Sequence, residues 1–160
     1  MNSTEIKITQ SIIEQTDDYE TAYSALIHWR WSQYERFRRS IVRSEFKESM
    51  ITNTEEYSIL VFIDLNRSPT LTQIAAYLAM EKSTVSEFIK RCINRQLILQ
   101  VQCNEDKRKR FYTLTKIGKE VLTASHNHMK IINKRLVSSL KKEEKQVFLE
   151  ILVKLNEGLT

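Results

Sequence analysis

Length and composition already exclude several classes of protein. The 160 residues suit one domain with added helices, and 41% of them are apolar, enough for a hydrophobic core. No apolar run approaches the roughly 20 residues needed to cross a bilayer, and residues 1–10 lack the pattern of a secretory signal, so we expect a cytoplasmic protein without a membrane partner. Two cysteines exclude a disulfide framework, and two glycines and one proline favour long helices.

Positive charge is concentrated in one segment of the chain. The net charge is +5, but residues 82–119 contain ten Lys or Arg against three acids, which leaves +7 there and −2 elsewhere. A basic segment in an otherwise near-neutral protein is typical of a surface that binds a polyanion. The alternative is a solvated charged face without a partner.

Apolar spacing predicts a long helix over residues 19–46, followed by a second helix that ends before Asn66. Thr52 with Glu55, or Asn53 with Glu56, is expected to form the capping box at the start of the second helix.

Two short helices follow Pro69. Thr70 is expected to cap the first of them, with Gln73 returning the bond. After a break at residues 80–81, the second covers residues 82–95 and places one apolar face inward. That face consists of Val85, Phe88, Ile89, Cys92 and Ile93.

A β-hairpin and two more helices complete the predicted order. Residues 97–102 and 110–115 are rich in β-branched and apolar side chains and predict two strands, joined by a charged tip at 104–109. Helical spacing then resumes at Lys116 for about 24 residues, and a last amphipathic helix follows. The apolar side of that last helix carries Val147, Phe148, Ile151, Leu152 and Leu155.

Two short helices and a hairpin predict a winged helix-turn-helix. The major groove of DNA admits one helix, whose first residues meet the base edges, and a helix N-terminus attracts phosphate. We expect the hydroxyls of Ser83, Thr84 and Ser86 to reach bases or phosphates, with one of them also capping the helix. The full set of expected DNA contacts on this helix is Lys82, Ser83, Thr84, Ser86, Glu87, Lys90 and Arg91.

The hairpin tip is expected to lie beside the duplex. It carries Lys107, Arg108, Lys109 and Arg110, and an arginine there can enter a narrow minor groove. The alternative is a solvated turn.

Residues 71–122 resemble the MarR family of bacterial transcription regulators. Three features carry the resemblance: the sequence STVS at 83–86, an Asp-x-Arg wing motif at 106–108, and an LT-x-x-G sequence at 114–118. Each is weak alone, but together they occur in order and at family-like spacing. The flanking helices agree in position and length, so the resemblance covers about the whole chain.

The resemblance implies a mainly α fold with a small β-hairpin wing and long N- and C-terminal dimerisation helices. The expected divisions are residues 1–50 and 116–160 for dimerisation and residues 51–115 for the winged domain. It further implies a homodimeric repressor that binds double-stranded DNA at a palindromic operator. In the family pattern Asp106 orients Arg108, which enters the minor groove.

Two residues depart from the family pattern. Gln96 stands where the family usually has glycine, just after the recognition helix, and glycine tolerates positive φ at a helix end. Glu87 replaces a frequent arginine, so an acid faces phosphates there, although it can accept a hydrogen bond from cytosine N4. An alternative function is therefore a winged-helix protein-interaction module that does not read DNA.

The first long helix contains a cluster of aromatic residues: His28, Trp29, Trp31 and Tyr34. The resemblance implies a pocket for a small-molecule effector between this helix and the winged domain. The alternative is that these side chains belong to the core or to a dimer interface.

No catalytic, cofactor or metal site is expected. His126 and His128 are two residues apart, which places them on different faces of a helix. The chain has no glycine-rich phosphate loop and no nucleophile elbow, so we do not expect an enzyme. Cys92 is expected in the core and Cys103 near the wing; redox sensing is not favoured, because redox-sensing relatives carry their cysteine in the first helix.

Overall fold

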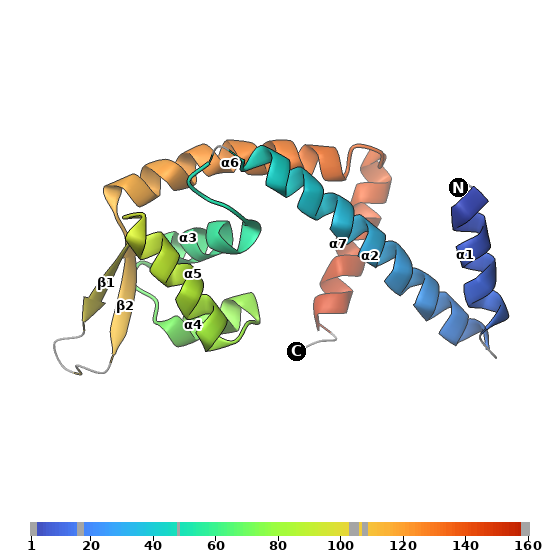
Figure 1. Cartoon of the computed structure of the whole chain (residues 1–160), viewed down its shortest axis with the longest axis horizontal. Coiled ribbons are helices and arrows are strands. Elements are labelled where there is room, and N and C mark those ends of the chain that lie inside the picture. Colours follow the sequence, from blue (N-terminus) through green and yellow to red (C-terminus); the bar gives the residue numbers. More distant parts are fainter. Residues whose placement is uncertain (1–2, 16–17, 48, 103–105, 107–108, 158–160) are drawn as a thin grey trace. The chain divides into compact units, whose positions relative to one another are not determined.

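The computed structural model describes residues 3–15, 18–47, 49–102, 106 and 109–157 (Figure 1). The chain forms two compact units, Met1–Ile41 and Val42–Thr160, which are described separately.

The first unit consists of α1 (Ser3–Glu14) and most of α2 (Tyr19–Glu45). Asp18 caps α2, because its carboxylate accepts hydrogen bonds from the Thr21 amide at 2.9 Å and from the Thr21 hydroxyl at 2.6 Å. The sequence predicted α2 but not α1. Four of the twelve residues of α1 are isoleucine, a β-branched residue whose helix propensity is only moderate.

The second unit contains the winged helix-turn-helix that the sequence predicted. Its helices are α3 (Thr54–Asn66), α4 (Leu71–Leu78) and α5 (Lys82–Asn94), and its hairpin is β1 (Ile98–Gln102) and β2 (Arg110–Leu114). The strands pair antiparallel, from Ile98 opposite Leu114 to Gln102 opposite Arg110. Two helices follow, α6 (Lys116–Leu136) and α7 (Lys142–Glu157), so α6 is slightly shorter than predicted.

The core of the winged domain lies between α3, α4, α5 and the start of β1. The inward face of α5 contributes Val85, Ile89 and Cys92, as predicted, whereas Phe88 is only half-buried. The other elements contribute Ile59, Leu60, Ile63, Ile74, Leu97 and Ile98, all essentially inaccessible to solvent.

Side-chain caps mark the start of α3 and of α4. Thr70 and Gln73 form the predicted capping box of α4. Of the two candidates for α3, Asn53 is the N-cap, and its side chain accepts from the Glu56 amide at 2.8 Å. The Glu56 carboxylate accepts from the Thr52 amide rather than from the Asn53 amide, so the reciprocal bond of the box is displaced by one residue.

The wing is joined to the helix-turn-helix through the middle of β2. The Tyr112 amide donates to the Pro69 carbonyl at 3.0 Å, and Thr70 forms an isolated bridge with Phe111. The start of α4 and strand β2 are therefore linked by backbone hydrogen bonds.

Gln96 has φ of 59°, in the left-handed region, at the turn between α5 and β1. This is the conformation that the glycine of the family pattern would adopt without strain. The turn between α5 and β1 therefore forms with glutamine at position 96, in the place of the glycine of the family pattern.

Helix α7 buries none of its residues. Val147, Ile151 and Leu155 recur every four residues along it and are each about half exposed. Among the described residues of this unit, no element covers this apolar stripe. In the described part of the chain, no helix combines the length and the apolar character needed to cross a membrane.

Candidate nucleic-acid interface

The outward face of α5 presents the hydroxyl groups predicted from the sequence. Ser83 and Thr84 are exposed and Ser86 is half-buried, and all three border one open depression together with Glu87 and Lys90. The expectation that one hydroxyl caps the helix is wrong, because the N-cap residue is Glu81, which makes no side-chain cap hydrogen bond. These hydroxyls therefore lie on the outward side of the helix and do not serve as its N-cap.

Charged side chains follow the hydroxyls along α5. Lys82 is exposed, and Lys90 donates to the Glu87 carboxylate at 2.6 Å. This hydrogen bond, together with the lysine charge, lowers the pKa of Glu87. Glu87 is thus paired within its own helix, which reduces the repulsion that an isolated acid would exert on phosphates.

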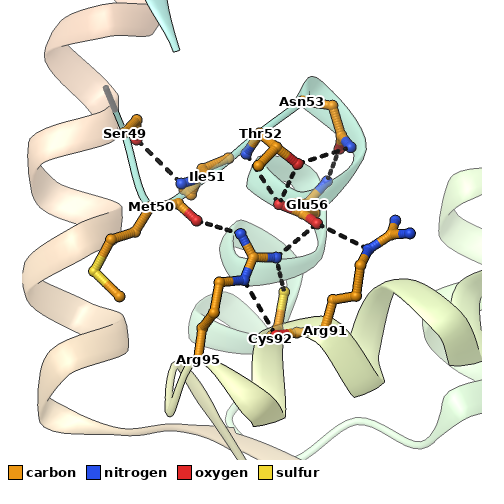
Figure 2. Close-up of polar contacts among 9 residues, drawn as sticks. All are labelled: Ser49, Met50, Ile51, Thr52, Asn53, Glu56, Arg91, Cys92 and Arg95. Atoms are coloured by element: carbon orange, nitrogen blue, oxygen red, sulfur yellow. Dashed lines mark hydrogen bonds and ion pairs between the residues drawn. The ribbon is translucent and has the colours of Figure 1, made fainter. Parts of the chain in front are cut away.

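Arg91 is held in place from two sides. Its guanidinium carbon lies 4.5 Å from the centre of the Phe88 ring, and its Nε lies 3.4 Å from Oε1 of Glu56 on α3 (Figure 2). Glu56 also accepts from Arg95 Nη2 at 2.7 Å, and Arg95 donates to the Met50 carbonyl. The sequence predicted Glu56 only as a capping residue and did not reveal these ion pairs.

Glu56 is a buried, ionised carboxylate. Burial raises its pKa, but hydrogen bonds from Arg95 and Thr52 outweigh burial, so the pKa lies below its usual value. A buried charge of this kind persists only when paired and hydrogen-bonded, and both conditions are met.

The structure describes only part of the basic hairpin tip that the sequence predicted. Arg110 is exposed at the start of β2, and the Lys109 amide donates to the Asp106 carbonyl at 2.9 Å. Lys107 and Arg108 lie outside the described residues, as does Cys103. The expected orientation of Arg108 by Asp106 therefore stays a prediction.

Helix α5 and the hairpin are neighbours in the winged domain. β1 follows α5 directly and contacts it, and β2 contacts α3 and α4. In Figure 1 the first turn of α5 and the far ends of both strands point toward the same side of this domain. Neither element is packed away in the interior.

The aromatic residues of α2 lie in the first unit. Trp31 is 46% exposed and contacts Tyr34 with a centroid distance of 5.9 Å, and Arg30 lies 4.7 Å from the Trp29 ring centre. His28 is also exposed. Whether these residues contact an effector stays a prediction.

A pocket of about 540 Å³ lies in the second unit, between α3 and α6. It is lined by Asp64, Lys119, Leu122, Thr123, His126, Asn127 and Lys130, and thus by none of the aromatic residues named above. Its charged and titratable lining side chains are two lysines, a histidine and the carboxylate of Asp64.

The two histidines of α6 make aromatic contacts on different neighbours. His126 packs edge-on against Tyr57, and His128 packs against Phe46, each at 5.7 Å between ring centres. Within the described ranges, no group of three or more His, Cys, Asp or Glu side chains is arranged to hold a metal ion.

Cys92 is a buried core thiol, as predicted. Burial raises its pKa to about 11, with the Glu56 charge as a second cause. The thiolate is the reactive form, so this cysteine is chemically quiet in the folded protein.

These elements define the class of the protein: α4, α5 and the hairpin form a winged helix-turn-helix whose second helix faces outward. Residues 52–109 match the sequence model of the MarR family. This segment is therefore a MarR-family winged helix-turn-helix domain, and the resemblance inferred from the motifs is confirmed. No curated protein matches the chain significantly.

Solved structures of DNA-binding proteins share the fold. Sco3205 from Streptomyces coelicolor, a MarR family transcriptional regulator in complex with DNA, has a TM-score of 0.76 at 22% identity, covering 85% of this chain and 90% of its own. BpsR from Bordetella bronchiseptica, whose DNA binding is regulated by 6-hydroxynicotinic acid, has a TM-score of 0.75 at 18% identity. The match covers 81% of this chain and 92% of the BpsR chain. A mutant of MarR from E. coli complexed with operator DNA has a TM-score of 0.72 at 15% identity. The match covers 82% of this chain and 91% of the MarR chain.

Proposed function

We propose that this chain is a homodimeric, cytoplasmic transcription regulator, and not an enzyme, that binds specific DNA sequences through α5 and the wing. The observation that carries the proposal is the outward face of α5. Its hydroxyls lie on the outer side of the helix and are not used as caps, and the same domain carries a hairpin with an exposed arginine, Arg110. A helix of this kind fits the major groove with its first turns against the bases.

The outward side chains of α5 have separate roles in this proposed arrangement. Ser83, Thr84 and Ser86 contact base edges or nearby phosphates. Lys82 and Lys90 contact phosphates. Glu87 accepts from a cytosine amino group once DNA phosphates compete for Lys90, which would give the protein a base preference.

The wing contacts the backbone and the adjacent minor groove. Arg108 enters the groove, oriented by Asp106, while Lys107 and Arg110 neutralise phosphates. Minor grooves narrowed by A·T-rich sequence carry enhanced negative potential, so these positions favour A·T-rich flanks.

A dimer explains the uncovered face of α7. The stripe of Val147, Ile151 and Leu155 is half exposed in the single chain and suits burial against a second copy. A twofold dimer carries two copies of α5, so its operator has two inverted half-sites about one helical turn or a multiple of it apart. Bound over a promoter, such a dimer represses by excluding polymerase.

The α3–α6 pocket supports release of DNA by a small effector. Lys119, His126 and Lys130 line it and outnumber the one acid there, Asp64, and DNA binding by BpsR is regulated by an aromatic acid, 6-hydroxynicotinic acid. We propose that the effector is a small aromatic anion with higher affinity for the conformer that does not bind DNA. His28, Trp29, Trp31 and Tyr34 are the alternative contact site, and Trp fluorescence would report binding there.

Operator selection tests the central claim. Purified protein is mixed with fragmented genomic DNA of the source organism, and bound fragments are sequenced over several rounds. We expect an inverted repeat to be enriched, and affinity for it to fall steeply with salt because bound cations are released from the phosphates. Enrichment of no sequence would contradict the proposal and favour the alternative, a protein-interaction module.

Substitutions then assign the contacts. Arg108→Ala is expected to weaken operator binding by about 1–3 kcal/mol, and Thr84→Ala should change which half-site base is preferred. Lys145→Ala, on an exposed position of α7, is the matched control and should bind as wild type. Gel-shift titrations measure all three, and wild-type affinity for Arg108→Ala would refute the wing assignment.

A further inference from the structure

Glu56 connects α3 to Arg91 of α5 and to Arg95, the C-cap residue of that helix, and the two arginines are held differently (Figure 2). Its Oε2 accepts from both the amide and the hydroxyl of Thr52 at 3.0 Å, which fixes the carboxylate from the α3 side. Its Oε1 faces Arg95 at 2.7 Å and Arg91 at 3.4 Å. Only 1% of the Glu56 side chain is exposed, so the carboxylate is a rigid reference point.

Arg95 is the internal partner. All three of its guanidinium nitrogens are engaged: Nε with the Arg91 carbonyl, Nη1 with the Met50 carbonyl, and Nη2 with Glu56 and the Cys92 sulfur. Its side chain is 25% exposed. Arg95 therefore ties α5 to the loop before α3 and to α3 itself.

Arg91 is the external partner. Its side chain is 53% exposed, and only Nε faces Glu56. The Phe88 ring covers one face of the guanidinium, and in Figure 2 the two terminal nitrogens point away from Glu56. With Nε in an ion pair with Glu56 and one face against Phe88, the guanidinium presents its remaining donors in one direction, the geometry that suits a phosphate.

We propose that Glu56 is a positioning residue for DNA binding, which holds Arg91 by Nε so that its terminal nitrogens are presented to a DNA phosphate beside α5. The inference rests on the proposed function. Holding the side chain before DNA arrives reduces the rotamer entropy lost on binding. Glu56 itself does not touch DNA in this arrangement.

A double-mutant cycle on Glu56→Gln and Arg91→Ala tests this. Affinity is measured for the selected operator and for an unrelated duplex over a range of salt concentrations, with the folded fraction of each variant checked by urea unfolding. Arg91→Ala should weaken both complexes about tenfold, as expected for one hydrogen bond to a charged group, and lower the salt slope by about one. Glu56→Gln should weaken both by a smaller factor.

The double variant separates positioning from a purely structural role. If Glu56 acts through Arg91, Glu56→Gln has no further effect on affinity once Arg91 is alanine. If its loss of affinity is the same in both backgrounds, the proposal is overturned. Lys90→Ala is the matched control, because it removes a phosphate contact that Glu56 does not touch, and there Glu56→Gln should keep its full effect.

Arg91→Lys keeps the inference testable if Glu56→Gln does not fold. Lysine retains the charge but lacks the Nε that Glu56 holds. Loss of most of the tenfold affinity supports positioning, and wild-type affinity overturns it. Failure of wild-type protein to bind any duplex would instead refute the proposed function, so the two failures are distinct.

Discussion

Gly118 in α6 lies directly against the backbone of Leu97, at the turn into β1. A β-carbon at position 118 would be 2.0 Å from the Leu97 carbonyl oxygen. The same turn is fixed by Thr115, whose amide donates to the Leu97 carbonyl at 3.1 Å and whose hydroxyl donates to the Gln96 carbonyl at 2.6 Å. The glycine of the LT-x-x-G sequence therefore has a packing role: it lets α6 approach the hairpin base.

Gly118→Ala should destabilise the protein although it lies in a helix. Alanine favours a helix over glycine by about 1 kcal/mol, but the added carbon must displace backbone, and overpacking costs about 1–3 kcal/mol or more. We expect a net loss in the free energy of unfolding, measured in urea. Glu120→Ala, exposed in the same helix, should change it little, and a stabilised Gly118→Ala protein would contradict the packing argument.

Gln96→Gly should stabilise the protein. Gln96 has φ of 59°, and a left-handed conformation costs a non-glycine residue about 1–2 kcal/mol. Part of the gain is lost through the greater freedom of glycine in the unfolded chain, so we expect an increase of about 0.5–1 kcal/mol. The matched control is Gln100→Gly in extended β1, which should destabilise; the same sign for both variants would rule out relief of strain.

Acid should weaken the fold through Glu56. Its pKa is lower in the folded protein than in the unfolded chain, where 4.5 is the ordinary value. The stabilisation is therefore fully present above that value and is lost as pH falls through the lower folded pKa. Urea unfolding across this pH range should show that the free energy of unfolding of the wild type decreases as pH falls. The decrease should be smaller for Glu56→Gln. An equal decrease in the free energy of unfolding for the two proteins would show that other groups cause the acid sensitivity.

Cys92 should resist thiol reagents until the domain unfolds. It is fully buried and its pKa is raised to about 11, so the folded protein holds almost no accessible thiolate at pH 8. In a Cys103→Ser variant, where Cys92 is the remaining cysteine, labelling should be slow in buffer and fast in urea. Rapid labelling of the folded variant would show that Cys92 is open to oxidants.

Ile151→Glu should convert a dimer into monomers. Ile151 lies in the middle of the exposed apolar stripe of α7, and a charge there would be buried unpaired at the interface. Light scattering after size exclusion gives the mass. Gln146→Glu, about opposite the stripe on the same helix, should leave the dimer intact; an unchanged mass for Ile151→Glu would show that this stripe is not the interface.

The sequence predicted the winged domain well because its signals are local. The Thr70 capping box, the apolar face of α5 and the β-branched strands each depend on residues a few positions apart, and each was confirmed. Helix α1 was missed because its isoleucines give a weak helical signal.

The candidate site was less predictable because its key contacts are non-local. Glu56 occupies a position where a carboxylate is typical of a capping box, and its partner Arg95 lies 39 residues away. Only the packing of α5 on α3 reveals that this acid is buried and shared by two arginines. Conversely, the hydroxyls of α5 were predicted correctly as surface groups because the helical period alone places them outward.

The hydrogen bond from the Tyr112 amide to the Pro69 carbonyl and the bridge between Thr70 and Phe111 have a mechanical consequence. They connect the middle of β2 to the entry of α4, so the wing is tied to the helix-turn-helix by backbone contacts as well as along the chain. In the proposed dimer, we therefore expect an effector to move the wing and α4 together, which would change the spacing between the two DNA-binding domains.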